Sequence, residues 1–96
     1  MNRDQVMVAK RRVTIVNQRG LHARAAAKFV KLAGSYEAEI LVRKDGMEVS
    51  GLSIMGLMML AAGLGAEIEL QAEGPARDSA LTALAGLVAA GFHEEV

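Results

Sequence analysis

An alternating segment closed by a two-residue turn limits this chain to folds that contain an antiparallel sheet. Residues 36–44 place charged side chains on one face and apolar side chains on the other, the apolar ones being Ala38, Ile40 and Val42. Asp45-Gly46 follows, and this pair accepts the positive φ that tight hairpin turns need. Residues 47–50 then return as the partner strand. The segment predicts a β-hairpin with one buried face and one face toward solvent.

Two more strands and a long helix are predicted around this hairpin. Residues 13–16 are β-branched and form a strand, and residues 67–73 alternate and form another. Residues 23–33 are strong helix formers. Apolar side chains recur among them every three or four positions, at Ala26, Phe29, Val30 and Ala33. This spacing predicts a helix with one buried stripe.

Two further helices complete the set of elements. Residues 52–60 predict a short and mostly apolar helix with Ser53 at or near its N-cap. The last helix should start at Gly74-Pro75, because proline is favoured in a first helical turn. Its buried stripe is formed by Leu81, Leu84, Leu87 and Val88.

The resulting order, β-α-β-β-α-β-α, is typical of a two-layered α+β fold. We expect one four-stranded antiparallel sheet with helices on one face. The other face should be solvated, and it should carry Thr14, Glu37, Glu39, Glu67 and Glu69. Ninety-six residues leave room for one domain. We place this domain at residues 12–96, after an N-terminal extension of residues 1–11 that shows little periodicity.

Charge and residue usage exclude several classes of function. Basic and acidic residues number 11 each, so no overall field attracts nucleic acid or an anionic membrane. The absence of cysteine and the presence of only two histidines, His22 and His93, exclude thiolate and His-rich metal sites. The most apolar stretch, residues 52–64, is too short and glycine-rich to span a bilayer, and the N-terminus lacks the apolar core of a secretion signal. We expect a cytoplasmic protein without metal, cofactor or membrane insertion.

His22 and Arg24 stand where a loop gives way to the first helix, in RGLHARAAAKFV. The first turn of a helix leaves backbone N–H groups unpaired at the positive end of the dipole, which favours an anion and disfavours an imidazolium. We therefore expect His22 to be a neutral imidazole, whose lone pair is a nucleophile. The planar guanidinium of Arg24 suits phosphate oxygens. From these residues alone, two interpretations stay open: a site that accepts a phosphoryl group, or a solvated histidine beside a solubilising arginine.

Two separate motifs, GLHARAAAKFV and GLSIMGLMML, resemble the HPr family. These are small phosphocarrier proteins of bacterial phosphoenolpyruvate-dependent phosphotransferase systems. The resemblance covers about residues 12–92, and the spacing between His22 and Ser53 matches that of the family. It implies the open-faced β-sandwich of the family, with which the predicted element order agrees. The chain departs from many members at Ala25, where they have proline; alanine restores an N–H group, so we expect a slightly less rigid site.

The resemblance also implies roles for particular residues. His22 is implied to be the phosphorylated histidine, through its Nδ1 nitrogen, and Arg24 to steady the phosphoryl oxygens. Ser53 matches the serine that a dedicated HPr kinase/phosphorylase modifies in many relatives. An apolar docking patch for partner proteins is implied at Ala23, Ala27, Ile54, Met55 and Met58. His93 lies in a charged tail, and we expect no role for it.

The function implied is that of a monomeric phosphoryl carrier rather than an enzyme. It would accept phosphate on His22 from phospho-Enzyme I and pass it to a histidine of an EIIA-type domain. The alternative is a non-catalytic regulatory module of the same fold that binds partner proteins through the patch. The sequence leaves open whether the carrier acts in sugar uptake or in nitrogen regulation. An RNA-binding or small-ligand domain lacks support, because the predicted sheet face is acidic and aromatic residues for base stacking are nearly absent.

Overall fold

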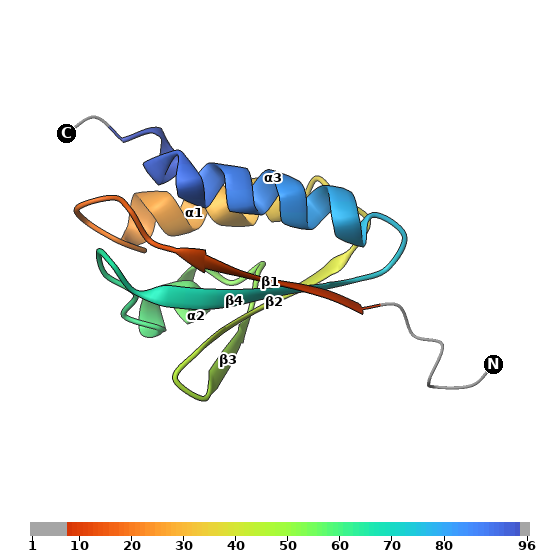
Figure 1. The fold of residues 1–96 in the computed structure, drawn as a ribbon, viewed down its shortest axis with the longest axis horizontal. Helices are drawn as coiled ribbons and strands as arrows, with labels where there is room; N and C mark the ends of the chain where they lie inside the picture. The colour runs from red at the N-terminus through yellow and green to blue at the C-terminus, as the bar shows by residue number, and fades with distance from the viewer. Residues whose placement is uncertain (1–7, 95–96) are drawn as a thin grey trace.

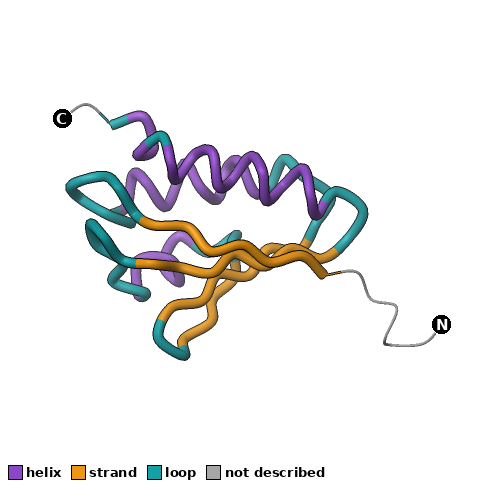
Figure 2. The backbone as a smooth tube through the Cα atoms, viewed as in Figure 1, coloured by secondary structure: helices purple, strands orange, loops and turns teal. Residues whose placement is uncertain are grey.

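The computed structural model describes residues 8–94, which form a four-stranded sheet and three helices (Figure 1). Its elements are β1 (Val8–Thr14), α1 (Ala23–Ala33), β2 (Glu39–Lys44), β3 (Met47–Ser50), α2 (Ile54–Met59), β4 (Glu67–Glu73) and α3 (Arg77–Ala89). A short turn at Gly91–His93 follows α3. The order of strands and helices along the chain, visible in Figure 2, confirms the predicted α+β class.

The strands lie in the order β1-β4-β2-β3, and every neighbouring pair is antiparallel. The predicted hairpin joins β2 to β3: Lys44 pairs with Met47, and Asp45 and Gly46 have φ values of 49° and 82°. α1 and α3 lie side by side over one face of the sheet (Figure 1). α2 packs against α1 and β3. One face of the sheet is thus covered by α1 and α3.

The opposite face is polar, as predicted. Of the polar residues expected there, Thr14, Glu39 and Glu67 are exposed and Glu69 is half-buried, whereas Glu37 is exposed but lies in the loop before β2 rather than in the sheet. On this face Arg43 of β2 donates hydrogen bonds to Glu48 of β3 at 2.6 Å and to Glu69 of β4 at 3.2 Å. Opposite charges on three neighbouring strands therefore satisfy one another without apolar cover.

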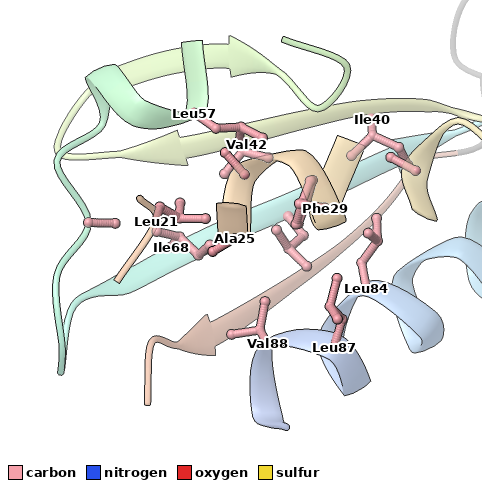
Figure 3. Close-up of a cluster of buried hydrophobic side chains, with 14 of the residues drawn as sticks. Leu21, Ala25, Phe29, Ile40, Val42, Leu57, Ile68, Leu84, Leu87 and Val88 are labelled. Carbon is pink, nitrogen blue, oxygen red and sulfur yellow. The ribbon is translucent and has the colours of Figure 1, made fainter. Parts of the chain in front are cut away.

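The core between the layers holds the start of α1 in place. Figure 3 shows Leu21, Ala25 and Phe29 among buried side chains of the sheet and α3. The predicted stripe of α1 is confirmed at Ala26, Phe29 and Ala33, whereas Val30 is half-buried. The predicted stripe of α3 is buried as well, at Leu81, Leu84, Leu87 and Val88. Because Leu21 and Ala25 are both buried, the backbone around His22 is anchored on each side.

The first strand spans Val8–Thr14 rather than residues 13–16. The prediction was therefore wrong for residues 8–11, which we assigned to an extension. They pair with β4, with Val8 opposite Glu73, and a boundary at residue 12 would cut through β1. β1 lies at an edge of the sheet, and only Ala9 and Val13 in it are half-buried. Because most side chains of this edge strand are exposed and several are charged, its sequence lacks the alternation of apolar and polar residues that predicts a strand. The rest of the predicted extension, residues 1–7, lies outside the described residues.

Three other element starts differ from the prediction, the first being that of α2, which begins at Ile54 rather than at residue 52. β2 begins at Glu39 rather than at residue 36, and α3 begins at Arg77, so Pro75 is not in the first helical turn. The Ala76 N–H donates to the carbonyl of Glu37 at 3.1 Å, which ties the two preceding loops together. This bond joins residues far apart in the chain, so local sequence does not encode it.

Candidate functional site

His22 is the N-cap residue of α1, and its carbonyl accepts the first helical hydrogen bond, from the Ala26 N–H at 2.9 Å. The loop before His22 packs against the loop after α2. The Leu21 N–H donates to the carbonyl of Ala62 at 2.9 Å. Gly20 has a φ of 63°, and a Cβ atom there would lie 2.3 Å from the same carbonyl oxygen. Close backbone packing thus requires glycine at this position and places the histidine at the helix start.

The imidazole of His22 is held from the other end of the chain. Its Nε2 atom contacts Oε2 of Glu94, and the two side chains are 17% and 16% exposed. The Nδ2 group of Asn17 donates to Oε1 of the same carboxylate at 3.1 Å. These hydrogen bonds, first from His22 and then from Asn17, hold the pKa of Glu94 below its ordinary value. Glu94 is therefore a carboxylate at neutral pH.

A left-handed turn carries Glu94 to the histidine. Gly91, Phe92 and His93 have φ values of 63°, 57° and 58°, a region that residues other than glycine adopt uncommonly. The side chain of Phe92 is fully buried, and Lys28 of α1 donates to its carbonyl at 2.6 Å. Figure 1 shows the end of the described chain and the start of α1 at the same end of the molecule. The turn is thus fixed by packing and by a bond to α1.

His22 lies between two cavities of different character. One, of about 360 Å³, is lined by Arg19, His22, Arg24, Lys28, His93 and Glu94. The other, of about 330 Å³, is lined by Arg19, Leu21, His22, Met58, Ala61, Ala62 and Gly63. Arg24 is exposed and has no ion pair within residues 8–94. We call the first the cationic cavity, because Arg19, Arg24 and Lys28 line it together with a single carboxylate, that of Glu94. The second cavity offers a more apolar surface beside it.

Four residues of this site were not predicted from the sequence: Asn17, Arg19, His93 and Glu94. Glu94 and Asn17 carry no motif, and Glu94 is 72 positions away from the histidine that it contacts. Arg19 stands in the quoted motif, but only the fold shows that it borders both cavities. His93, for which we expected no role, lines the cationic cavity. Across the described part of the chain, no group of three or more His, Cys, Asp or Glu residues could hold a metal ion.

Ser53 is the N-cap residue of α2, as predicted, and its Oγ atom accepts a hydrogen bond from the Gly56 N–H at 2.9 Å. The predicted patch residues are all exposed, namely Ala23, Ala27, Ile54, Met55 and Met58. Met55 is 72% exposed, and two residues of the same segment that were not predicted, Leu52 and Met59, are also exposed. Since α2 packs against α1 and Met58 lines the apolar cavity, this surface adjoins His22.

Comparison with known proteins gives a consistent result. The model of a family described as "PTS HPr component phosphorylation site" matches residues 9–90. The phosphocarrier protein HPr of Cupriavidus necator is 45% identical over 85 residues, which are 88% of this chain and 96% of that protein. The phosphocarrier protein NPr of Escherichia coli K12 is 40% identical over 90 residues, which are 93% of this chain and 100% of that protein.

Solved structures agree with the fold. A crystal structure of HPr from Thermoanaerobacter tengcongensis has a TM-score of 0.87 and 40% identity, and the match covers 92% of this chain and 99% of that one. An HPr dimer from the same organism has a TM-score of 0.72 and 41% identity, covering 85% of this chain and 94% of that one. No helix within residues 8–94 is long and apolar enough to cross a membrane.

Proposed function

The chain belongs to the HPr family of phosphocarrier proteins of the phosphotransferase system, and we propose that it carries a phosphoryl group on His22. His22 accepts the group from phospho-Enzyme I and passes it to a histidine of an EIIA-type domain. In this proposal the protein is a covalent intermediate of the relay and not an enzyme that acts alone. The monomer predicted from sequence is part of the proposal, because one chain contains every residue of the site.

The observation that supports this proposal is the position of His22 at a helix N-terminus, on the border of a cationic cavity. The N–H groups of the first turn of α1 have no partner within the helix and can donate to phosphoryl oxygens. The guanidinium of Arg24 adds a charge that cannot be lost and two donors in one plane. Together these amides and the guanidinium stabilise the negative charge of a phosphoryl group bound to the His22 ring.

The transfer needs no proton to leave the histidine. A ring nitrogen of His22 uses its lone pair to form a bond to phosphorus. The bond between phosphorus and the donor's histidine nitrogen breaks, and its electron pair stays on the donor's ring. Donation to the next histidine is the same exchange with His22 as the leaving group. Because a nitrogen–phosphorus bond of a histidine breaks and another forms in each step, loading and unloading of the carrier are both reversible.

Partners dock, in this proposal, on the exposed apolar surface that α2 presents beside α1. Flexible methionine side chains suit a surface that meets several partners in turn. Ser53 lies at the edge of this surface, and we include its phosphorylation by an HPr kinase/phosphorylase in the proposal. A phosphate there adds about −1.5 to −2 charges at pH 7 next to apolar side chains, which should weaken docking.

The test is incubation with Enzyme I and phosphoenolpyruvate, followed by intact mass measurement before and after acid treatment. We expect a gain of one acid-labile phosphoryl group. His22→Ala should abolish it, whereas His93→Ala, which removes the other histidine, should retain it. A label that survives in His22→Ala would contradict the proposal. Complete absence of label in the wild-type protein would instead favour the regulatory module that binds partners through the same surface.

A further inference from the structure

We propose that Glu94 is a positioning residue that selects which ring nitrogen of His22 takes the phosphoryl group. This inference rests on the proposed function and names a determinant of the same site. Glu94 contacts Nε2 of His22. By holding the proton on Nε2, it leaves the lone pair on Nδ1, which then becomes the nucleophile.

The proton position follows from the chemistry of the pair. An ionised carboxylate can only accept hydrogen bonds, so the ring nitrogen that contacts it has to carry the proton. A neutral imidazole has one N–H group, and the other nitrogen then presents its lone pair. The side chain of His22 makes no capping hydrogen bond to the first turn of α1. Its Nδ1 atom is therefore not engaged by the α1 amides.

Glu94 is itself held in place by a second side chain. Asn17 is 6% exposed, and its Nδ2 group donates to the carbonyl of Gly20 at 2.9 Å and to Oε1 of Glu94 at 3.1 Å. One oxygen of the carboxylate is thus bound to Asn17 and the other faces His22. This arrangement leaves the carboxylate little freedom to turn away from the ring.

The backbone that carries Glu94 is constrained as well. The preceding left-handed turn is anchored by the buried ring of Phe92 and by the bond from Lys28 to its carbonyl. Holding non-glycine residues in this region costs free energy, and such conformations persist where the surroundings determine them and often at functional sites. Both halves of the contact, the ring and the carboxylate, are therefore fixed before any donor arrives.

The same contact assists the transfer in both directions. When the Nδ1 lone pair forms the bond to phosphorus, the donor's nitrogen–phosphorus bond breaks and its electron pair returns to the donor's ring. The proton on Nε2 stays, so the His22 ring gains positive charge next to the Glu94 carboxylate. A carboxylate beside a histidine in this way fixes the tautomer and stabilises the imidazolium that forms. On unloading, the ring returns to its neutral form with the same proton in place.

The experiment compares the wild-type protein with Glu94→Gln and with Glu37→Gln. Glutamine keeps the shape of Glu94 but removes the charge that dictates the tautomer. Glu37 is an exposed carboxylate in the loop before β2 and serves as the matched control. Nitrogen-15 NMR of the unphosphorylated proteins reports which ring nitrogen of His22 carries the proton. We expect the Nε2–H form in the wild type and the control, and a mixture of tautomers in Glu94→Gln.

The phosphorylated products are then compared by phosphorus-31 and nitrogen-15 NMR. We expect only Nδ1-phosphohistidine in the wild type and the control. Glu94→Gln should load about 10- to 100-fold more slowly, as when the partner that orients a ligand histidine is lost, and should show a measurable share of Nε2-phosphohistidine. Thermal unfolding in parallel identifies any variant that fails to fold, and Glu94→Asp, which keeps the charge, should restore much of the selectivity.

Two results would overturn the inference. One is an unchanged tautomer in folded Glu94→Gln, and the other is a changed tautomer with phosphorylation still confined to Nδ1. Loading with a small donor, phosphoramidate, separates this inference from the proposed function. A wild-type protein that Enzyme I fails to load but phosphoramidate loads at Nδ1, with selectivity lost in Glu94→Gln, would refute the relay while supporting the role of Glu94.

Discussion

Replacing Gly20 by alanine should destabilise the loop that presents His22 more than the same change at another left-handed glycine. Gly20 has a φ of 63°, and a left-handed conformation costs a residue with a Cβ atom about 1–2 kcal/mol. The added atom would also lie 2.3 Å from the carbonyl oxygen of Ala62 and 2.8 Å from Cα of Gly63. Both neighbours are backbone atoms, so the loops must move apart, which costs about 1–3 kcal/mol more.

The matched control is Gly46→Ala in the turn between β2 and β3. Gly46 has a φ of 82°, but a Cβ atom there meets nothing within 4 Å. It should therefore cost about 1–2 kcal/mol, from conformation alone. The total for Gly20→Ala is about 2–5 kcal/mol, and one kcal/mol shifts the Tm of a domain of this size by about 4–8 °C. We expect the Tm of Gly20→Ala to fall by at least about 8 °C.

The assay is thermal and urea unfolding followed by far-ultraviolet circular dichroism, because the chain has no tryptophan. At a temperature where both variants are folded, Gly20→Ala should also load phosphate more slowly, since the Leu21 N–H bond to Ala62 is stretched. Gly46→Ala should load at the wild-type rate. Equal melting temperatures for Gly20→Ala and Gly46→Ala would refute the reasoning, because the steric cost at Ala62 would then be absent.

Substitutions at three other residues, Arg24, Ser53 and Glu94, should change phosphoryl transfer or stability. Arg24→Ala should leave the Tm unchanged but slow phosphoryl transfer about 10- to 100-fold, which corresponds to a lost charge-assisted bond of about 1.5–3 kcal/mol; rapid-quench kinetics measure this. Ser53→Ala should lower the free energy of unfolding by about 1 kcal/mol, because the N-cap of α2 is lost. Ser53→Asp should have the Tm of the wild type, yet Enzyme I should load it more slowly. Equal loading rates for Ser53→Asp and the wild type would indicate that Ser53 is a cap without a regulatory role. Because the folded-state pKa of Glu94 is lowered, its contribution to stability is present above its ordinary value of about 4.5 and is lost as the pH falls through the lowered pKa. Melting curves between neutral and acid pH should therefore show a larger loss for the wild type than for Glu94→Gln.

Local signals in the sequence were sufficient to predict most of the scaffold and half of the site. The hairpin follows from alternation and Asp45-Gly46, and the N-cap position of His22 follows from the helix formers after it. Ser53 was predicted at or near a cap for the same reason, and its bond to Gly56 confirms this. Each of these features depends on residues within a few positions of one another, where intrinsic preferences act directly.

The remaining features depend on contacts that no local pattern encodes. β1 is an edge strand whose partner supplies its order, so its charged residues gave no reason to start it at Val8. The contact of Glu94 with His22 needs α3 to pack first and then a turn through Phe92 and His93 in a conformation rare for such residues. Tertiary packing determines both the start of β1 and the Glu94 contact. From the sequence, the residues after α3 show only that a carboxylate is available.

The pairing of β1 with β4 has a consequence for how the protein is made. Within the described sheet, β1 pairs with β4 alone, so the first strand has no partner until residues 67–73 have left the ribosome. Pairing across such a span closes a long loop, which slows folding and keeps the growing chain open. A nascent chain that stops before Gly91 holds His22 and Arg24 but not the carboxylate that orients the ring. Only when both ends of the chain have met can a newly synthesised molecule hold His22 in the arrangement described above.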